Sequence, residues 1–119
     1  MKIKSIVIGT GVGIKHIEAL NSTFNSEVIG ICEKDETKHR YLKKKFKEVK
    51  IFSKFSDILF FKKKINLISI ASHDSDHFKQ IKLLSNICKN FIVEKPMVTT
   101  PRELKNLRKI VKKKKLKIF

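Results

Sequence analysis

The sequence has few of the residues that mark several classes of protein. It contains two cysteines, Cys32 and Cys88, which lie far apart without CxxC spacing, so we expect neither a disulfide nor a cysteine metal site. Both thiols are expected to be reduced and buried, as in a cytoplasmic protein. No apolar run approaches the ~18 residues of a membrane span. The start, MKIKSIVIG, lacks the apolar stretch and cleavage site of a secretory signal, and no membrane partner is expected.

Arginine is also scarce, although the chain is strongly basic. The formal net charge is +17, yet the 28 basic residues include only Arg40, Arg102 and Arg108 as arginines. Arginine is the better ligand for phosphates and bases, and no known nucleic-acid-binding motif accompanies the charge. The lysines are scattered, with runs at 43–45, 62–64 and 112–115. A basic excess of this size can indicate a nucleic-acid-binding surface. We instead interpret the charge as solvated surface and expect no nucleic-acid partner.

Short apolar segments alternate with segments of helical periodicity along the whole chain, without a linker or repeat. Near-continuous apolar strands indicate a parallel sheet covered on both faces, and 119 residues suit one domain. The sequence predicts an α/β fold, a Rossmann-like doubly wound parallel sheet of about six strands with helices on both faces. The expected strands are 3–8, 27–32, 50–52, 66–71, 91–93 and 116–119; the expected helices are 14–23, 35–47, 76–86 and a segment from 100, with a helical turn at 56–61.

Two of these helices carry specific expectations. The helix over 35–47 should pack its apolar side chains Tyr41, Leu42 and Phe46 against the sheet. The last helix should open at Thr100, with Pro101 in its first position and Glu103 in its third, which is good N-terminal chemistry.

A glycine-rich loop at 9–13 follows the first expected strand. Glycines between a strand and a helix allow a tight turn and close approach of a dinucleotide pyrophosphate to the helix N-terminus. The usual spacing is GxGxxG, so Ile14 stands where the third glycine is expected, and the loop is one residue short. A dinucleotide loop and an ordinary glycine turn both remain open. The candidate cofactor-binding residues here are Gly9, Thr10, Gly11, Val12 and Gly13.

Glu33 ends the second expected strand, 24 residues after Gly9. An acid about 20 residues beyond such a loop is expected to accept hydrogen bonds from ribose hydroxyls. Its charge favours NAD as the cofactor because it repels the 2′-phosphate of NADP. Lys34, a second candidate, and Lys38 follow closely and soften that preference, so NADP is not excluded. The alternative is a solvated acid at a strand end.

The loop after the fourth expected strand, ASHDSDH at 71–77, is rich in histidine and aspartate. These residue types are suitable metal ligands. However, the loop joins a parallel strand to a helix, and the segment 74–76 (Asp-Ser-Asp) suits a helix N-cap. We therefore expect capping and cofactor contact, and no metal, with Ser72, His73 and His77 as candidate cofactor-binding residues.

Topology predicts that these loops meet. In a doubly wound sheet of order 3-2-1-4-5-6, the carboxyl ends of strands 2, 1, 4 and 5 lie side by side, and ligands bind there. A dinucleotide along that edge has its adenine ribose at Glu33 and its pyrophosphate at the glycines. Its nicotinamide then lies near Ser72 and Lys95, which follows the fifth strand.

Four segments, in this order and spacing, resemble the N-terminal Rossmann domain of the Gfo/Idh/MocA oxidoreductases: GTGVGIKHIEAL, VIGICEKD, ISIASHDSDH and FIVEKPMVTTPRELKNL. The resemblance covers essentially the whole chain, and Glu-Lys-Pro at 94–96 is its most specific mark. It implies that Lys95 contributes to the active site and that Glu94 helps to hold the cofactor. His16 and His77 match histidines of that family, whereas Ser72-His73 replaces the Thr-Pro of many members.

The resemblance also implies a reaction and a second domain. The reaction is NAD(P)-dependent hydride transfer at a sugar or cyclitol carbon, and family members are much longer, with a second α/β domain that supplies most substrate contacts. We therefore expect residues 1–119 to be an NAD(P)-binding domain, truncated or half of a split enzyme. A sugar-like substrate is then expected only if a second domain or a partner chain completes the site. A non-catalytic dinucleotide-binding module, an enzyme remnant and a basic interaction protein that reuses the fold remain alternatives.

Overall fold

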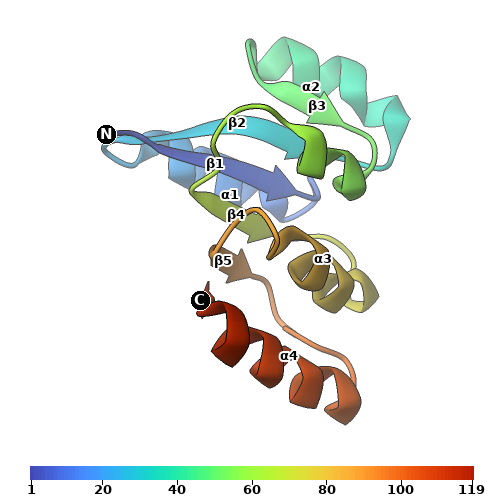
Figure 1. Ribbon diagram of the computed structural model, residues 1–119. Coiled ribbons are helices and arrows are strands. Elements are labelled where there is room, and N and C mark those ends of the chain that lie inside the picture. The colour runs from blue at the N-terminus through green and yellow to red at the C-terminus, as the bar shows by residue number, and fades with distance from the viewer.

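All six strands form one parallel sheet in the order β3-β2-β1-β4-β5-β6, in a computed structural model that describes residues 1–119 (Figure 1). The predicted fold class and strand order are therefore confirmed. The strands are β1 (Ile3–Ile8), β2 (Ser26–Cys32), β3 (Lys50–Phe52), β4 (Leu67–Ile70), β5 (Asn90–Val93) and β6 (Lys117–Ile118). The helices are α1 (Gly13–Ser22), α2 (His39–Lys45), α3 (His77–Leu84) and α4 (Pro101–Lys114), with 3-10 turns η1 (Glu36–Lys38), η2 (Phe55–Phe60) and η3 (Asp74–Asp76).

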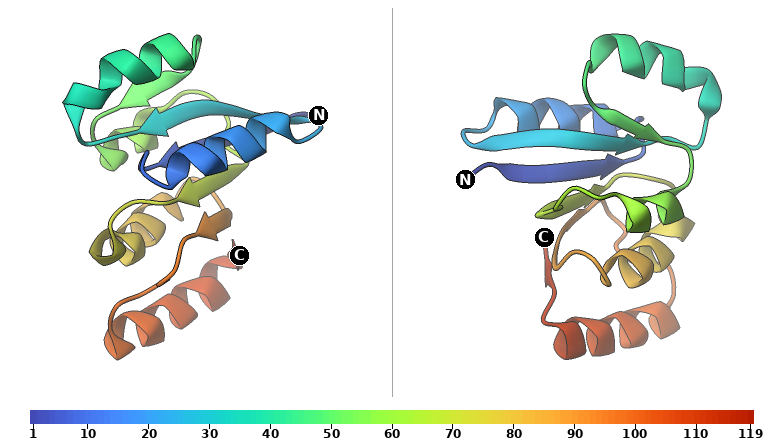
Figure 2. Two further views of the ribbon diagram at one scale, coloured as in Figure 1. Left: turned by 180° about the vertical axis from the view of Figure 1, so that it is seen from behind. Right: turned by 45° about the horizontal axis from the view of Figure 1, so that its top comes forward.

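The pleat of the sheet divides its apolar side chains between two layers of helices, because successive side chains of a strand point to opposite faces. On one face Val7 of β1 packs with Ile17 of α1 and Leu42 of α2. On the other face a larger core joins the strands to η2, α3 and α4, with Ile6 and Phe91 among its fully buried members. Figure 2 shows α1 on one side of the strands and η2 and α3 on the other. Both faces of the central strands are thus covered, as predicted.

The helix expected over 35–47 differs from the prediction in one packing contact. It begins as η1, and its regular part is α2. Leu42 is buried, but Tyr41 is 56% exposed, so the prediction that Tyr41 packs against the sheet is wrong. Adjacent residues of an α-helix point about 100° apart, so in this short helix Leu42 and its neighbour do not both face the sheet.

The start of α4 confirms the predicted N-terminal chemistry. The Thr100 side chain accepts a hydrogen bond from the Glu103 backbone N–H at 3.1 Å, and Pro101 is the first helical residue. The Glu103 carboxylate in turn accepts from the Thr99 N–H at 2.9 Å. These reciprocal bonds satisfy donors that a helix start otherwise leaves unpaired.

The capping predicted at 74–76 is wrong. No side chain caps η3 or α3. Asp76, which precedes α3, has helical angles (φ −95°, ψ −16°), whereas a capping residue needs extended backbone. Its carboxylate pairs with Lys79, one turn along the chain, at 2.9 Å.

Both cysteines are unpaired and buried, as predicted. Burial, followed by the charges of Glu33 and Asp57, raises the pKa of the Cys32 thiol to about 12. Because the thiolate is the reactive form, this thiol is a weak nucleophile at neutral pH, and it packs in the core.

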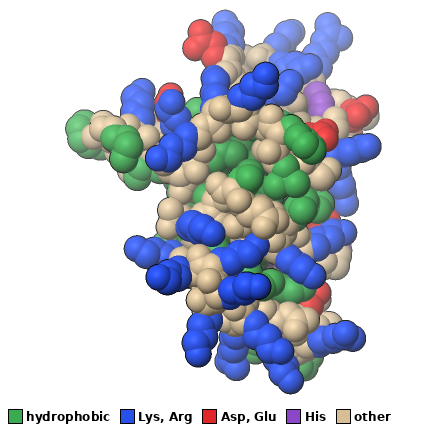
Figure 3. All heavy atoms as spheres, in the orientation of Figure 1, with side chains coloured by type: hydrophobic (Ala, Val, Ile, Leu, Met, Phe, Trp, Pro, Cys, Tyr) green, Lys and Arg blue, Asp and Glu red, His purple; other side chains and the backbone are tan.

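The basic residues are spread over the surface. In Figure 3 lysine and arginine side chains project from much of the visible face, from α2 at the top to α4 at the bottom, around a central area of hydrophobic side chains and with few acids between them. None of the helices has the length and apolar character needed to cross a membrane.

Candidate cofactor-binding site

The loops that follow β2, β1, β4 and β5 lie side by side at one edge of the sheet. Backbone hydrogen bonds extend the sheet into these loops: Gly9 N–H donates to the Cys32 carbonyl at 2.8 Å, and Ala71 N–H donates to the Ile8 carbonyl at 2.8 Å. Glu94 N–H donates to the Ile70 carbonyl at 2.9 Å. The structure thus brings together the four loops that hold the predicted candidates.

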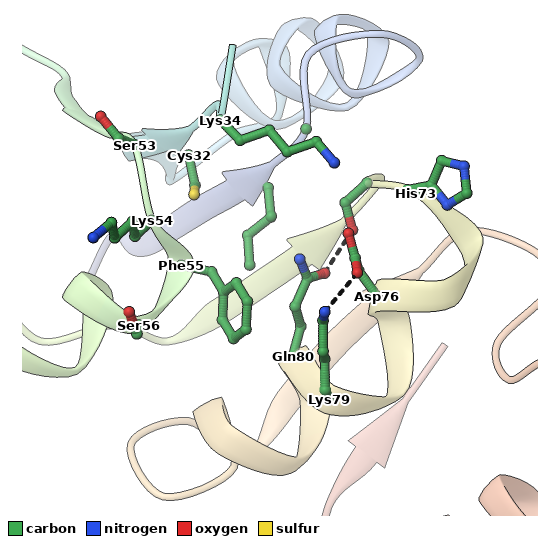
Figure 4. A pocket seen from close by; sticks show the side chains of 13 residues that line it. Cys32, Lys34, Ser53, Lys54, Phe55, Ser56, His73, Asp76, Lys79 and Gln80 are labelled. Carbon is green, nitrogen blue, oxygen red and sulfur yellow. Dashed lines mark hydrogen bonds and ion pairs between the residues drawn. The ribbon is translucent and has the colours of Figure 1, made fainter. Parts of the chain in front are cut away.

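A cavity of about 470 Å³ opens between the loops after β1, β2 and β4 and the segment after β3, and no residue of the β5 loop lines it (Figure 4). In Figure 4 the Lys34 side chain extends across the cavity toward the loop of His73 and Asp76, and the Phe55 ring projects from η2. Of the predicted candidates, four line this cavity: Gly9, Lys34, Ser72 and His73. Sequence reasoning missed the segment after β3, which contributes Ser53, Lys54, Phe55 and Ser56. The predicted strand order could have indicated this segment, because it places β3 beside β2.

The glycine loop is shaped by Gly9 and Gly13. Gly9 has φ +90°, and a Cβ atom there would lie 2.5 Å from the Ala71 carbonyl oxygen, so no other residue fits without strain. Gly13 is the first residue of α1, and a Cβ there would lie 3.3 Å from a methyl group of Val7. Gly13 therefore permits the close packing of helix on strand that the third glycine of GxGxxG normally permits. The short spacing moves this role from position 14 to position 13.

The N-terminus of α1 carries no side-chain cap and no acid in its first turn. A Cβ atom on Gly11 would meet no atom within 4 Å, so the loop presents open space there. Val12, which precedes the helix, is 53% exposed. The Ile14 and Lys15 N–H groups donate within the loop, to the Gly11 and Val12 carbonyls, and the positive end of the helix dipole suits an anion.

The Glu33 carboxylate is held by the chain itself. It accepts hydrogen bonds from the Thr10 backbone N–H at 3.2 Å, from the Thr10 hydroxyl, and from the Asp35 N–H at 2.9 Å. Burial alone raises the pKa of Glu33, but these hydrogen bonds and the Lys38 charge outweigh it and hold the pKa below its usual value. The side chain is only 9% exposed. A carboxylate has about four acceptor positions, so the anion keeps little capacity for an additional donor.

His77 connects the loops after β4 and β5. Its Nδ1 lies 2.8 Å from the Pro96 carbonyl oxygen and its Nε2 lies 3.0 Å from the Ser72 carbonyl oxygen. The residue is fully buried. Its contacts are therefore with the two loops that it connects.

His16, on α1, makes a second connection to the same turn. Its Nε2 lies 2.8 Å from a carboxylate oxygen of Glu94, and its Nδ1 lies 2.5 Å from the Ser69 hydroxyl of β4. Because a carboxylate only accepts, Nε2–H donates to Glu94, and in a neutral ring Nδ1 accepts from Ser69. The His16 hydrogen bond is the main reason that the pKa of Glu94 lies below its usual value.

This serine–histidine–glutamate set is not the triad of a hydrolase. Ser69 is fully buried in the sheet, so its hydroxyl is closed to any substrate. The set lines a shallow groove beside α1 and lines no part of the larger cavity. Its contacts therefore serve to hold Glu94 in place.

Lys95 is exposed and forms none of the ion pairs of the chain. It stands between Glu94 and Pro96, which are held by His16 and His77, respectively. The structure thus leaves one free cation at the carboxyl end of β5, beside the loop of Ser72.

Comparison with known proteins agrees with this architecture. A family model described as an oxidoreductase family with an NAD-binding Rossmann fold matches residues 3–119. No curated protein sequence matches the chain.

Three solved structures share the fold. Scyllo-inositol dehydrogenase from Lactobacillus casei, with bound NAD(H) and scyllo-inositol, superposes with a TM-score of 0.90 at 20% identity. The WlbA dehydrogenase from Bordetella pertussis, in complex with NADH and UDP-GlcNAcA, gives 0.89 at 21% identity, and myo-inositol 2-dehydrogenase from Lactobacillus plantarum gives 0.88 at 18% identity. In each case the alignment covers 100% of this chain and 36% of the other chain. The chain therefore spans little more than a third of the length of these proteins.

Proposed function

The chain belongs to the Gfo/Idh/MocA oxidoreductase family as its NAD-binding Rossmann domain, and we propose that it binds the dinucleotide along the carboxyl edge of its sheet. One observation carries the proposal: the strand order brings the glycine loop, Glu33 and the 470 Å³ cavity to the same edge. Ligands of open α/β sheets bind where the strand order reverses, which here lies between β1 and β4.

The residues at this edge fit the parts of a dinucleotide. The uncapped start of α1 and the open space at Gly11 suit the pyrophosphate. The cavity beside Lys34 and Phe55 suits the adenosine end because it offers an aromatic face and a cation. The nicotinamide end then lies toward Ser72 and Lys95. Thr10, Val12 and Gly13 complete the loop, while His73 borders the cavity.

We propose NAD as the preferred form of the cofactor. Glu33 is anionic at neutral pH, since its pKa is lowered, and its charge disfavours a 2′-phosphate nearby. Lys34 and Lys54 line the same cavity and moderate this preference. The Glu33→Ala variant tests it: the ratio of NADPH to NADH affinity should rise about tenfold, as measured by calorimetry, and an unchanged ratio refutes the assignment.

The reaction that fits this family is hydride transfer between the nicotinamide and a sugar or cyclitol carbon. The bound dinucleotide supplies the hydride chemistry, and Lys95 supplies a proton or polarises the substrate oxygen. The named relatives act on inositols or bind a nucleotide sugar, which supports this substrate class. Catalysis requires water to be excluded from the reactants, so turnover is proposed only where a second domain or partner chain closes the edge over Lys95.

Direct titration with NADH is the first experiment. NADH binding is followed by its fluorescence and by calorimetry, with Gly9→Ala as the variant expected to lose it. Absence of binding by the native chain at millimolar NADH would overturn the proposed function. The alternative, a module that binds dinucleotide without turnover, is favoured by the exposed position of Lys95. Binding without NAD reduction across a panel of inositols and sugars, even after a candidate second domain is added, supports that alternative.

A further inference from the structure

The Glu-Lys-Pro turn at 94–96 is held on both sides of Lys95 by histidines. His16 holds the carboxylate of Glu94 at 2.8 Å, and His77 holds the carbonyl oxygen of Pro96 at 2.8 Å. The Lys95 side chain, in contrast, is exposed and forms none of the ion pairs of the chain. The point at which this flexible side chain leaves the backbone therefore depends on how firmly the neighbouring residues are fixed.

Both histidines connect this turn to the end of β4. The second nitrogen of His16 faces the Ser69 hydroxyl at 2.5 Å, and the second nitrogen of His77 faces the Ser72 carbonyl at 3.0 Å. His16 comes from α1 and His77 from α3, which cover opposite faces of the sheet. The His16 ring bonds on both sides, because Glu94 accepts and Ser69 can donate. The His77 ring faces two carbonyl oxygens, and in its neutral form it donates to only one of them. Each rigid ring occupies the space between β4 and the turn and so sets their spacing. The two spacings act on either side of Lys95.

We infer that His16 and His77 are positioning residues that fix the backbone of the turn from which Lys95 reaches the nicotinamide end of the cofactor edge. This inference rests on the proposed function for the ligand, but the restraint on the turn exists without a ligand. A small displacement of a catalytic group strongly lowers the reaction rate and the selectivity of binding. Because the Lys95 side chain has no partner of its own, its position depends on a rigid backbone. His16 lies one turn inside α1, the helix that follows the glycine loop. It therefore connects that loop to the turn at 94–96.

The test compares two ligands in His16 variants. NADH carries both ends of the dinucleotide, whereas ADP-ribose lacks the nicotinamide. In His16→Ala, NADH affinity should fall about tenfold, equivalent to ~1.4 kcal/mol, while ADP-ribose affinity stays within about twofold. In His16→Gln the amide N–H can replace Nε2–H toward Glu94, so NADH affinity should recover. A parallel loss of both ligands, or no loss of NADH affinity, overturns the inference.

A second readout needs no ligand. Hydrogen exchange is measured by NMR at the Glu94 amide, which donates to the Ile70 carbonyl at 2.9 Å, against the Lys109 amide of α4. It should accelerate about tenfold in His16→Ala and return in His16→Gln. His77→Leu removes the polar contact to the Pro96 carbonyl and should give the same acceleration, with a thermal melt to confirm that this buried site still folds. Unchanged exchange at Glu94 in folded variants overturns the inference. If the native chain binds no NADH, the proposed function fails, and the exchange data still decide whether the histidines restrain Lys95.

Discussion

Two glutamates end parallel strands at the same edge of the sheet, and they are held in different ways. Glu33, after β2, is 9% exposed and bonds to backbone N–H groups and to the Thr10 hydroxyl of the adjacent loop. Glu94, after β5, is 34% exposed, and its side-chain partner is His16. The pKa of each carboxyl is lowered, but by neighbours of a different kind.

The two carboxylates therefore differ in what determines their positions. The backbone mainly determines that of Glu33, and a side chain determines that of Glu94. Two of the three hydrogen-bond donors to Glu33 are backbone N–H groups, of Thr10 and Asp35, so its position follows mainly from the chain trace. Glu94 depends on one imidazole, which a single substitution removes. We therefore expect substitutions around Glu33 to lower the stability of the fold. Substitutions around Glu94 should leave stability nearly unchanged and should affect ligand binding instead.

The largest effect should come from Gly9→Ala, which strikes the backbone on which the Glu33 side depends. The new Cβ would meet the Ala71 carbonyl oxygen at 2.5 Å with φ at +90°, so the free energy of unfolding should fall by about 3 kcal/mol or more. Urea denaturation measures this change. Gly11→Ala is the matched control, because its Cβ meets nothing within 4 Å, and it should alter stability by less than ~1 kcal/mol. Equal effects in the two variants would contradict the assigned loop geometry.

Glu33→Gln should have the next largest effect. It removes the charge from an acceptor of three hydrogen bonds, so the free energy of unfolding should fall by about 1–3 kcal/mol at pH 7. Because the folded pKa is lowered from 4.5, the stabilisation is present above pH 4.5 and is lost as the pH falls through the folded pKa. Urea midpoints at pH 7 and pH 3 should show a native–variant difference that shrinks in acid. A difference independent of pH would show that the carboxylate charge is not what the loop binds.

Glu94→Gln should cost less than about 1 kcal/mol in unfolding free energy, because the pair with His16 is partly exposed and screened by solvent. The sign with pH is the same as for Glu33, since this pKa is also lowered. A double-mutant cycle with His16→Ala, followed by thermal melts, isolates the coupling. If the loss matched that of Glu33→Gln, the contrast between the two glutamates would disappear.

Lys95→Met should have the smallest effect on the fold. The side chain is exposed and forms no ion pair, so stability should change by no more than ~0.5 kcal/mol, as chemical denaturation can show. The matched surface control is Lys105→Met, on α4. A loss well above that of the control would reveal a structural contact for Lys95 and remove the basis for treating it as a free cation.

The sequence predicted the features that depend on local pattern. Apolar periodicity gave the strands, the doubly wound topology gave their order, and the residues at 100–103 gave the start of α4. The loops that meet at the cofactor edge followed from topology alone. Partners within those loops did not, because they depend on side-chain rotamers and on β1 lying beside both β2 and β4. For this reason neither the bond from Thr10 to Glu33 nor that from His16 to Glu94 was foreseen. Asp76 failed as a predicted cap because its backbone joined the helix.

Gly13 carries a lesson for recognising nucleotide-binding loops by pattern. Glycine is favoured at whichever position lies where the helix first approaches the sheet. Here that position is Gly13, the first residue of α1. A search that demands two residues between the second and third glycines would reject this chain, although the close contact with Val7 is made. A geometric rule, which asks for a residue without a side chain at the point of nearest helix–strand approach, would accept it. A shortened glycine loop is therefore better recognised by the distance between helix and strand than by the spacing of its glycines in the sequence.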